Sequence, residues 1–260
     1  MSGHSKWASI KHKKGATDAK RGKLFTKMAA EIAVAAQSGA DPTMNFKLRL
    51  AIQKAKAANV PTGNIERAIA KGSGLGGGAK LTELLYEGYG PAGVAIMVKA
   101  LSDNHNRTGP DVKSTFSKHG GNLGAQGSVA YLFAQKGVIV CNSDIDRDET
   151  ELTAIDAGAD DIDDSGDQLV IYTSPNALEN IKASLGDSVE QADIQMVASQ
   201  TIVVCDESKA KTLLNLIDAL EDLDDVVEVT SNFDVPEEIL NKLRWKYSGL
   251  TQALRPLALG

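Results

Sequence analysis

A glycine-rich segment divides the chain into two parts with different hydrophobic patterns. Residues 72–78 read Gly-Ser-Gly-Leu-Gly-Gly-Gly, which places five glycines in seven positions and is typical of a flexible linker. Before this segment apolar residues recur at helical spacing, and after it short strand-like segments alternate with helical ones. We therefore expect an α+β protein with a domain boundary at these glycines. The length of 260 residues suits two or three domains.

The part before the glycines predicts a three-helix bundle. Apolar residues at helical spacing indicate one helix over residues 17–39, a second over 45–59 and a short third that ends at Gly72. Residues 1–16 are rich in Lys and His and poor in apolar residues, so we read them as a basic arm. The arm and the bundle together form the predicted first domain, residues 1–78.

The part after the glycines predicts two α/β units, one inserted into the other. Residues 137–199 follow the order β-α-β-β-α-β of a ferredoxin-like fold. The segments on either side of them complete each other, which predicts a discontinuous domain of residues 79–136 plus 200–240, followed by a tail of residues 241–260. The strands expected outside the insertion are 94–101, 128–133, 201–205 and 226–231, and the helices are 111–119 and 208–222.

The formal net charge of −6 conceals a division of charge along the chain. Residues 1–80 hold 15 Lys and Arg against 4 Asp and Glu, residues 81–136 hold 5 against 4, and residues 137–260 hold 8 against 26. Such asymmetry points to a nucleic acid or another anionic partner at the basic end. The acidic domains would repel a polyanion and so orient the molecule with its first 80 residues toward the phosphates.

Cysteine usage and hydropathy predict a cytoplasmic protein. Cys141 and Cys205 show neither C-x-x-C spacing nor the density of a secreted scaffold, so we expect both to be reduced core residues. The first residues lack the apolar segment of a signal peptide, and no apolar run reaches the 18 residues that a membrane span needs. We expect no contact with a membrane.

No enzyme chemistry stands out in the sequence. The loop of residues 102–108 brings Asp103, His105 and Arg107 together, but no nucleophile, base and orienting group can all be named. The chain has no G-x-S-x-G turn, no H-E-x-x-H and no P-loop. We interpret the loop as a polar connection in which Asn106 or Thr108 caps the following helix. An enzyme that uses this loop remains a third option.

Two further motifs resemble a cofactor site and a metal site, but the residues around them do not fit either kind of site. We therefore expect neither a metal nor a cofactor. Residues 72–77 match G-x-G-x-x-G, but the match follows a helix and precedes a strand, the reverse of a dinucleotide-binding turn. Asp161, Asp163 and Ser165 resemble the start of a calcium loop. The twelfth position, however, is Tyr172 rather than a bidentate glutamate.

The basic arm and the first helix form the candidate binding site. Cations attract phosphates, and a tryptophan among them can stack on a base or a sugar. On the first helix, the lysines form a stripe about 120° from the apolar one, facing solvent or a partner. No feature reads bases specifically. The candidate residues of the arm and the helix are His4, Lys6, Trp7, Lys11, His12, Lys13, Lys14, Lys20, Arg21, Lys23 and Lys27.

Several motifs resemble those of the YebC/PmpR family, which includes the mitochondrial translational activator of cytochrome c oxidase I. The resemblance covers about residues 1–235 in order. The motifs are Gly3-His-Ser-Lys-Trp-Ala8, Ile10-Lys-His-Lys13, Asp18-Ala-Lys-Arg-Gly-Lys23, Asn64-Ile-Glu-Arg-Ala-Ile69, Tyr86-Glu-Gly-Tyr-Gly-Pro91, Ser102-Asp-Asn104 with Asn106-Arg-Thr108, and Gly120-Gly-Asn-Leu-Gly124 with Gly127-Ser-Val-Ala-Tyr-Leu-Phe133.

The resemblance implies a three-domain cytoplasmic regulator of gene expression without a catalytic site. Some members of the family are labelled probable transcriptional regulators that bind DNA. Others are implicated in translation, acting on ribosomes that stall at proline-rich stretches. Carried onto this chain, the nucleic-acid contacts fall on the arm and the basic helix. A weaker candidate is the loop with Asn104, Asn106 and Arg107.

Several alternatives stay open at the level of sequence. The lack of a base-reading code and of a dimerisation heptad favours ribosomal RNA and a monomer, whereas the family label favours DNA. A rival function is a protein-binding adaptor whose acidic residues 137–260 engage a basic partner such as a ribosomal protein. The tail, with Trp245 among its basic residues, is either a second anionic contact or an amphipathic helix packed on the body.

Overall fold

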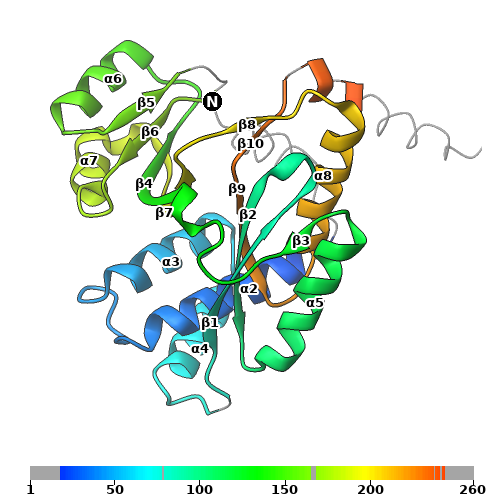
Figure 1. Cartoon of the computed structure of the whole chain (residues 1–260). Coiled ribbons are helices and arrows are strands. Elements are labelled where there is room, and N and C mark those ends of the chain that lie inside the picture. The colour runs from blue at the N-terminus through cyan, green and yellow to red at the C-terminus, as the bar shows by residue number, and fades with distance from the viewer. Residues whose placement is uncertain (1–17, 78, 165–167, 237, 241, 244–260) are drawn as a thin grey trace, which may run out of the picture.

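Figure 1 shows the structure, a computed structural model that describes residues 18–77, 79–164, 168–236, 238–240 and 242–243. Helices come first along the chain and antiparallel sheets with helices follow, which confirms the predicted α+β class. Among the helices of these residues, none is both long enough and apolar enough to cross a bilayer.

Three helices pack around a core of their own at the start of the described chain. Their apolar stripes meet in a cluster that includes Ile32, Leu48 and Ile65. Asn45 fixes one junction, because its side-chain oxygen accepts the N–H of Leu48 at 3.1 Å while its amide donates to the carbonyl of Ala35 at 2.8 Å. The three helices are α2 (Asp18–Ala36), α3 (Phe46–Ala57) and α4 (Thr62–Gly72).

A four-stranded antiparallel sheet with the order β3-β1-β2-β9 follows the glycine-rich segment. Its last strand, β9, comes from far along the chain and pairs with β2, which supports the proposed discontinuous domain. Helices α5 and α8 cover one face, where Phe116 and Leu213 are fully buried. The elements are β1 (Thr82–Tyr89), β2 (Ala95–Ser102), α5 (His105–Lys118), β3 (Asn122–Leu123), α8 (Glu207–Glu221) and β9 (Val226–Ser231).

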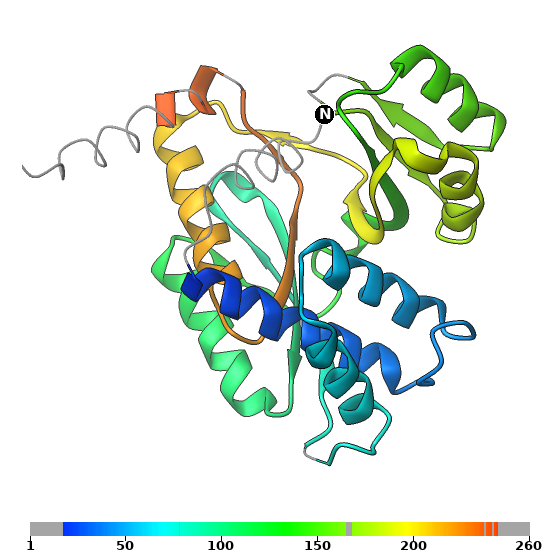
Figure 2. The ribbon, with the colours of Figure 1, turned by 180° about the vertical axis from the view of Figure 1, so that it is seen from behind.

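Helix α2 lies on the other side of this sheet, where it packs against β2 and β9. Figure 2 shows it from behind, running across the strands with its N-terminal part beside α8. The helical unit is therefore docked on the sheet, and the basic helix meets a segment almost 200 positions away in the sequence.

The chain between the two halves of this sheet forms a second four-stranded sheet with the order β5-β6-β4-β7 and two helices. These residues follow the β-α-β-β-α-β order, and we keep the limits 137–199 as a proposal. Phe46 and Leu50 of α3 pack into the core of this inserted unit. The elements are β4 (Phe133–Cys141), α6 (Arg147–Asp156), β5 (Asp161–Asp163), β6 (Val170–Thr173), α7 (Leu178–Leu185) and β7 (Val189–Ala198).

The strand expected over residues 201–205 is shorter and pairs elsewhere. Strand β8 (Ile202–Val203) forms a separate two-stranded parallel sheet with β10 (Phe233–Asp234) and does not join the four-stranded one. Most of the tail lies outside the described residues. Leu243 within it is buried in the core under α8, so the beginning of the tail packs on the body.

The strand expected over residues 128–133 is wrong. Residues 130–132 form a 3₁₀ turn, and β4 starts only at Phe133. The cause is tertiary: the buried carboxylate of Glu87 accepts the N–H groups of Gly127, Val129 and Ala130 at 2.7–2.8 Å. Burial raises the pKa of this carboxyl, but the three hydrogen bonds outweigh it and keep the pKa below its ordinary value. Strand β1, which carries Glu87, was not among the expected strands.

Two local expectations are also corrected. Helix α5 starts at His105 rather than residue 111, because Asn104 is its N-cap and accepts the N–H of Asn106 at 3.1 Å. The expected cap at Asn106 or Thr108 is therefore wrong. Cys141 is buried as expected, and burial raises the pKa of its thiol to about 11, but Cys205 is exposed.

Candidate nucleic-acid interface

The predicted arm lies outside the described residues. His4, Lys6, Trp7 and the cations of residues 11–14, which are Lys11, His12, Lys13 and Lys14, lie outside the described residues. The backbone of Lys20 belongs to α2, but its side chain is not among those described. The candidate residues that can be located are Arg21, Lys23, Lys27 and the loop at the start of α5.

The lysine stripe of α2 has a partner within the chain. Lys23 Nζ lies 3.1 Å from Asp224 Oδ1 and donates to the carbonyl of Asp222 at 3.2 Å. One turn further along, Lys27 Nζ donates to the carbonyl of Glu221 at 2.5 Å. These carbonyls end α8, where the helix dipole places partial negative charge that favours a cation. The stripe that was expected to face solvent or a partner thus docks α2 on α8, although the side chain of Lys23 stays 53% exposed.

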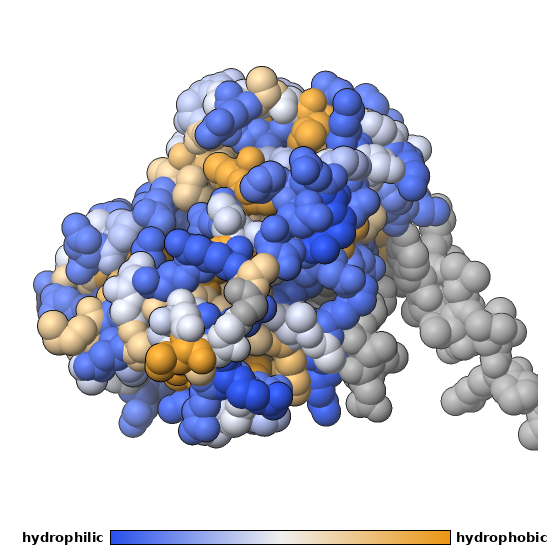
Figure 3. Space-filling model, turned by 90° about the horizontal axis from the view of Figure 1, so that it is seen from below, coloured by the Kyte–Doolittle hydropathy of each residue, from blue (hydrophilic) through white to orange (hydrophobic). Residues whose placement is uncertain are grey.

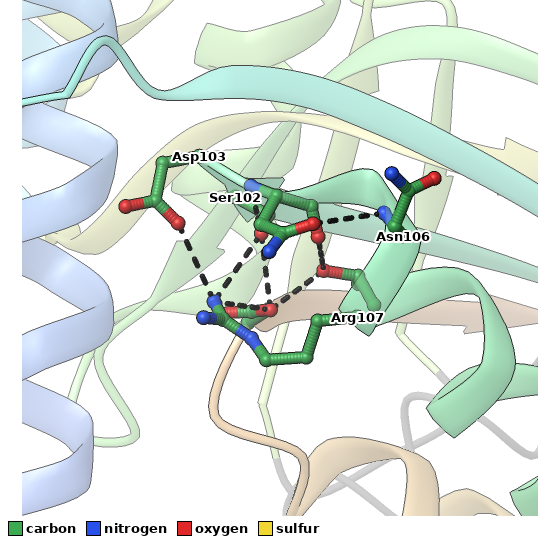
Figure 4. A network of polar contacts seen from close by, with 7 residues as sticks. Ser102, Asp103, Asn106 and Arg107 are labelled. Carbon is green, nitrogen blue, oxygen red and sulfur yellow. Dashed lines mark hydrogen bonds and ion pairs between the residues drawn. The ribbon is translucent and has the colours of Figure 1, made fainter.

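Arg107 in the α5 loop is held by carboxylates rather than left open. Its Nη2 lies 3.1 Å from both carboxylate oxygens of Asp225 and 3.5 Å from Asp103 Oδ1. Ser102 and Thr108 add hydroxyl donors to Asp225, at 3.1 and 2.6 Å. Figure 4 shows Ser102 and Arg107 directed at the Asp225 carboxylate, which lies just before β9, and Asp103 directed at Arg107.

The same network sets the charge state of Asp225. Burial raises the pKa of this carboxyl, but hydrogen bonds from Thr108, Arg107 and Ser102 outweigh it, so the pKa lies below the ordinary aspartate value. Asp225 therefore remains ionised and neutralises Arg107. In Figure 4 the amide of Asn106 points away from the network, and the side chain is exposed. The loop anchors β9 to α5 and offers little free positive charge.

A surface pocket of about 520 Å³ joins these two groups of residues. Lys23 and Arg107 lie on its wall, which brings together two candidate residues that are 84 positions apart in the sequence. Four aspartates, Asp111, Asp222, Asp224 and Asp225, share the same wall. The carboxylates outnumber the cations, so the pocket repels a phosphate, and the geometry provides no anion site here.

Two cations of α3 form ion pairs with other elements of the fold. Lys54 Nζ lies 3.2 Å from Glu31 Oε2 on α2 and 3.4 Å from Asp193 Oδ2 on β7. Burial lowers the pKa of Lys54, but the carboxylates of Glu31, Asp193 and the nearby Glu228 outweigh it, so the pKa is raised and the lysine stays charged. Arg49 makes a longer ion pair of 3.7 Å with Glu179 of α7. These contacts hold the helical unit against the inserted unit.

Four other cations of the helical unit remain open. Arg21, Lys47, Lys56 and Lys71 are exposed, and their side chains form neither an ion pair nor a hydrogen bond in the described part of the chain. We call these four the open cations. Arg67 is exposed too, but it donates to the carbonyl of Gly63 within its own helix. Only Arg21 among the open cations is a candidate residue predicted from the sequence. The other three lie on predicted helices outside the apolar stripes, which is the signal that could have identified them.

The described residues contain no group of three or more His, Cys, Asp or Glu side chains that could hold a metal. Asp161 and Asp163, the start of the apparent calcium loop, lie in β5 and pair with β6 rather than forming a loop. Ser165 and Gly166 lie outside the described residues.

Comparisons with known proteins cover nearly the whole chain. A family profile described as "TACO1/YebC protein N-terminal domain" matches residues 5–75, and one described as "TACO1/YebC second and third domain" matches residues 81–233. A "probable transcriptional regulatory protein" of Halothermothrix orenii is 50% identical over 250 residues, covering 94% of this chain and 99% of the relative. One of Geobacter sulfurreducens is 49% identical over 247 residues, covering 94% of this chain and 100% of the relative.

The fold also matches a crystal structure. A conserved hypothetical protein of Aquifex aeolicus superposes with a TM-score of 0.82 at 47% sequence identity, covering 90% of this chain and 98% of that one.

Proposed function

Because the chain belongs to the TACO1/YebC family, whose curated relatives are named probable transcriptional regulatory proteins, we propose that it is a non-enzymatic regulator that binds nucleic acid through its basic N-terminal region. The target is DNA or ribosomal RNA. The observation that carries this proposal is the division of charge: 15 Lys and Arg against 4 Asp and Glu in residues 1–80.

The arm and the open cations supply most of the cations that meet phosphates in this proposal. Lys23 and Lys27 contribute less, because they already have partners at the end of α8. Arg107 contributes least, because Asp225 and Asp103 neutralise it. The acidic units are held away from the polyanion by like-charge repulsion, so the nucleic acid meets only the helical side of the molecule.

Neutralising the arm tests the proposal. In a variant with Lys11, Lys13 and Lys14 changed to Gln, the affinity for a labelled DNA duplex and for a labelled ribosomal RNA fragment is measured by fluorescence anisotropy over a series of salt concentrations. We expect weaker binding and a salt slope that is shallower by about 0.7–0.9 for each phosphate that the protein no longer neutralises. An unchanged affinity and slope would overturn the proposal.

Crosslinking in cells separates the two targets. Sequencing of the nucleic acid attached to the protein is expected to recover ribosomal RNA if the protein acts in translation. Promoter fragments without ribosomal RNA would instead assign it to transcription. The same arm variant provides the control, since its recovery of the true target should fall.

A further inference from the structure

Helix α6 of the inserted unit exposes its large apolar side chains, which is the reverse of what a surface helix usually does. Such a helix normally buries its large apolar side chains and exposes its polar ones. In α6, Leu152 is 65% exposed and Ile155 is 59% exposed, whereas the buried positions hold the small residues Thr150 and Ala154. Elsewhere, as on the face shown in Figure 3, exposed hydrophobic residues lie in small groups among hydrophilic ones.

The neighbouring helix shows that the fold does not require this orientation. Helix α7 packs against α6 in the same unit and buries Leu178, Ile181 and Leu185. The core beneath α6 is closed by Ala154, which is fully buried, and the hydroxyl of Thr150 donates to the carbonyl of Asp146 at 2.6 Å. Leu152 and Ile155 belong neither to this core nor to the residues packed against it, so a polar residue at either position would leave the core intact.

The exposed apolar pair is surrounded by acidic residues on the same face. At 100° per residue, Asp148, Glu149 and Asp156 lie within about 60° of Leu152, as does Ile155. All five side chains are exposed, and we call them the α6 outer face. The surrounding charge has the same sign, since residues 137–199 hold 15 Asp and Glu against 2 Lys and Arg. Of the two cations, Arg147 pairs with Asp164 and Lys182 donates to Gln53.

The negative charge around Leu152 and Ile155 disfavours some of the partners that could cover this apolar pair. A second copy of the α6 outer face, a nucleic acid or an anionic membrane would each bring like charge against it. A cationic protein segment brings opposite charge at the rim and can bury Leu152 and Ile155 at the centre. We propose that the α6 outer face is the docking site for a cationic amphipathic helix of a protein partner, separate from the nucleic-acid interface.

A synthetic helical peptide tests the site. The peptide carries Leu at positions i, i+3, i+4 and i+7 with Lys elsewhere, and a second peptide has the same composition with the order scrambled so that no apolar face forms. Calorimetry measures the affinity of the full chain for each peptide, and backbone NMR shifts locate the contact. We expect the patterned peptide to bind at least about tenfold more tightly and to shift α6, because only it can bury the apolar pair.

Substitutions then separate apolar burial from simple charge attraction. Leu152→Ser with Ile155→Ser should weaken the patterned peptide by about tenfold or more. Val203→Ser, which removes an aliphatic side chain that is 56% exposed on β8, should leave it unchanged. Asp148→Asn with Asp156→Asn should slow association and flatten its salt dependence. Because the changed positions are exposed, circular dichroism should show unchanged folding.

Three results would overturn the inference. Equal affinity for the two peptides would mean that the α6 outer face attracts cations through its charge alone and has no site for an amphipathic helix. Unchanged affinity of the Leu152→Ser, Ile155→Ser variant would place the contact elsewhere. Self-association that sediments as a dimer and is abolished in this variant would assign the face to a second copy. The Leu152→Ser, Ile155→Ser variant keeps the charge of the protein, so its nucleic-acid affinity should equal that of the parent protein, and failure here is distinguishable from failure of the proposed function.

Discussion

The helical unit carries two groups of cations that look alike in the sequence and differ in the structure. Lys23, Lys27 and Lys54 bind carbonyls or carboxylates of other segments and hold the units together. The open cations, Arg21, Lys47, Lys56 and Lys71, are exposed without an ion pair among the described residues. Some of these cations thus stabilise contacts between the units, and only the others are available to a polyanion.

The largest expected effect is on nucleic-acid affinity when the open cations are removed. Changing Arg21, Lys47, Lys56 and Lys71 to Gln should weaken binding near 0.1 M salt by roughly tenfold for each phosphate that is left without its cation. Anisotropy titrations with DNA and RNA measure it. The matched control changes Lys23 and Lys27 to Gln, which should affect affinity much less while lowering the free energy of unfolding by about 1 kcal/mol. A greater loss of affinity in the control would reverse the comparison.

The next effect concerns the stability of the junction around Lys54. Lys54→Met keeps the aliphatic stem but leaves Glu31 and Asp193 facing each other without a cation. We expect the free energy of unfolding, measured with urea, to fall by about 2 kcal/mol. Lys56→Met, further along the same helix and exposed, should change it by less than about 0.5 kcal/mol. Equal effects would show that Lys54 is no more engaged than an open cation.

A third effect is a change in acid stability through Asp225. Its pKa is lower in the folded protein than the ordinary value of about 4. The ionised carboxylate therefore stabilises the fold above that value, and this contribution is lost as the pH falls through the folded pKa. Asp225→Asn should lower stability at pH 7 by about 1 kcal/mol and make the loss of stability toward pH 3 less steep. Parallel pH curves for the variant and the parent protein would contradict this account.

The smallest effect tests whether an engaged lysine can be converted into an open one. Asp224→Asn removes the carboxylate 3.1 Å from Lys23 but keeps the hydrogen bond to the carbonyl of Asp222. We expect nucleic-acid affinity to rise by about twofold to threefold, because the substitution removes one negative charge and frees part of a cation. Asp187→Asn, an exposed acidic residue of the inserted unit, should change affinity less. A larger rise for Asp187→Asn would indicate that only the total charge matters.

Helices with regular periodicity were predicted with useful accuracy, and elements that depend on distant partners were not. The predicted helix over residues 208–222 matches α8, and the strand over 226–231 matches β9, because apolar spacing determines both. The turn at residues 130–132 depends on the Glu87 carboxylate about 40 positions earlier, which no local pattern contains. The start of α5 was missed because Pro110 lies inside the helix and masks the Asn104 cap.

The candidate site divides in the same way. The sequence shows that cations are concentrated before the glycine-rich segment, and this is sufficient to predict a polyanion partner for that region. It does not distinguish Lys27 from Lys56, because both are lysines on helices. Nor does the composition of α6 reveal which of its residues face outward.

The sequence by itself determined the α+β class, the helical first unit and the opposite charges of the two ends of the chain, because periodicity and composition are local properties. Only the tertiary structure decided which charges are open. Lys23 meets a carbonyl 199 positions away and Lys54 a carboxylate on β7. Ion pairs and hydrogen bonds act over a few ångströms in space, so their partners become visible only once the chain has folded.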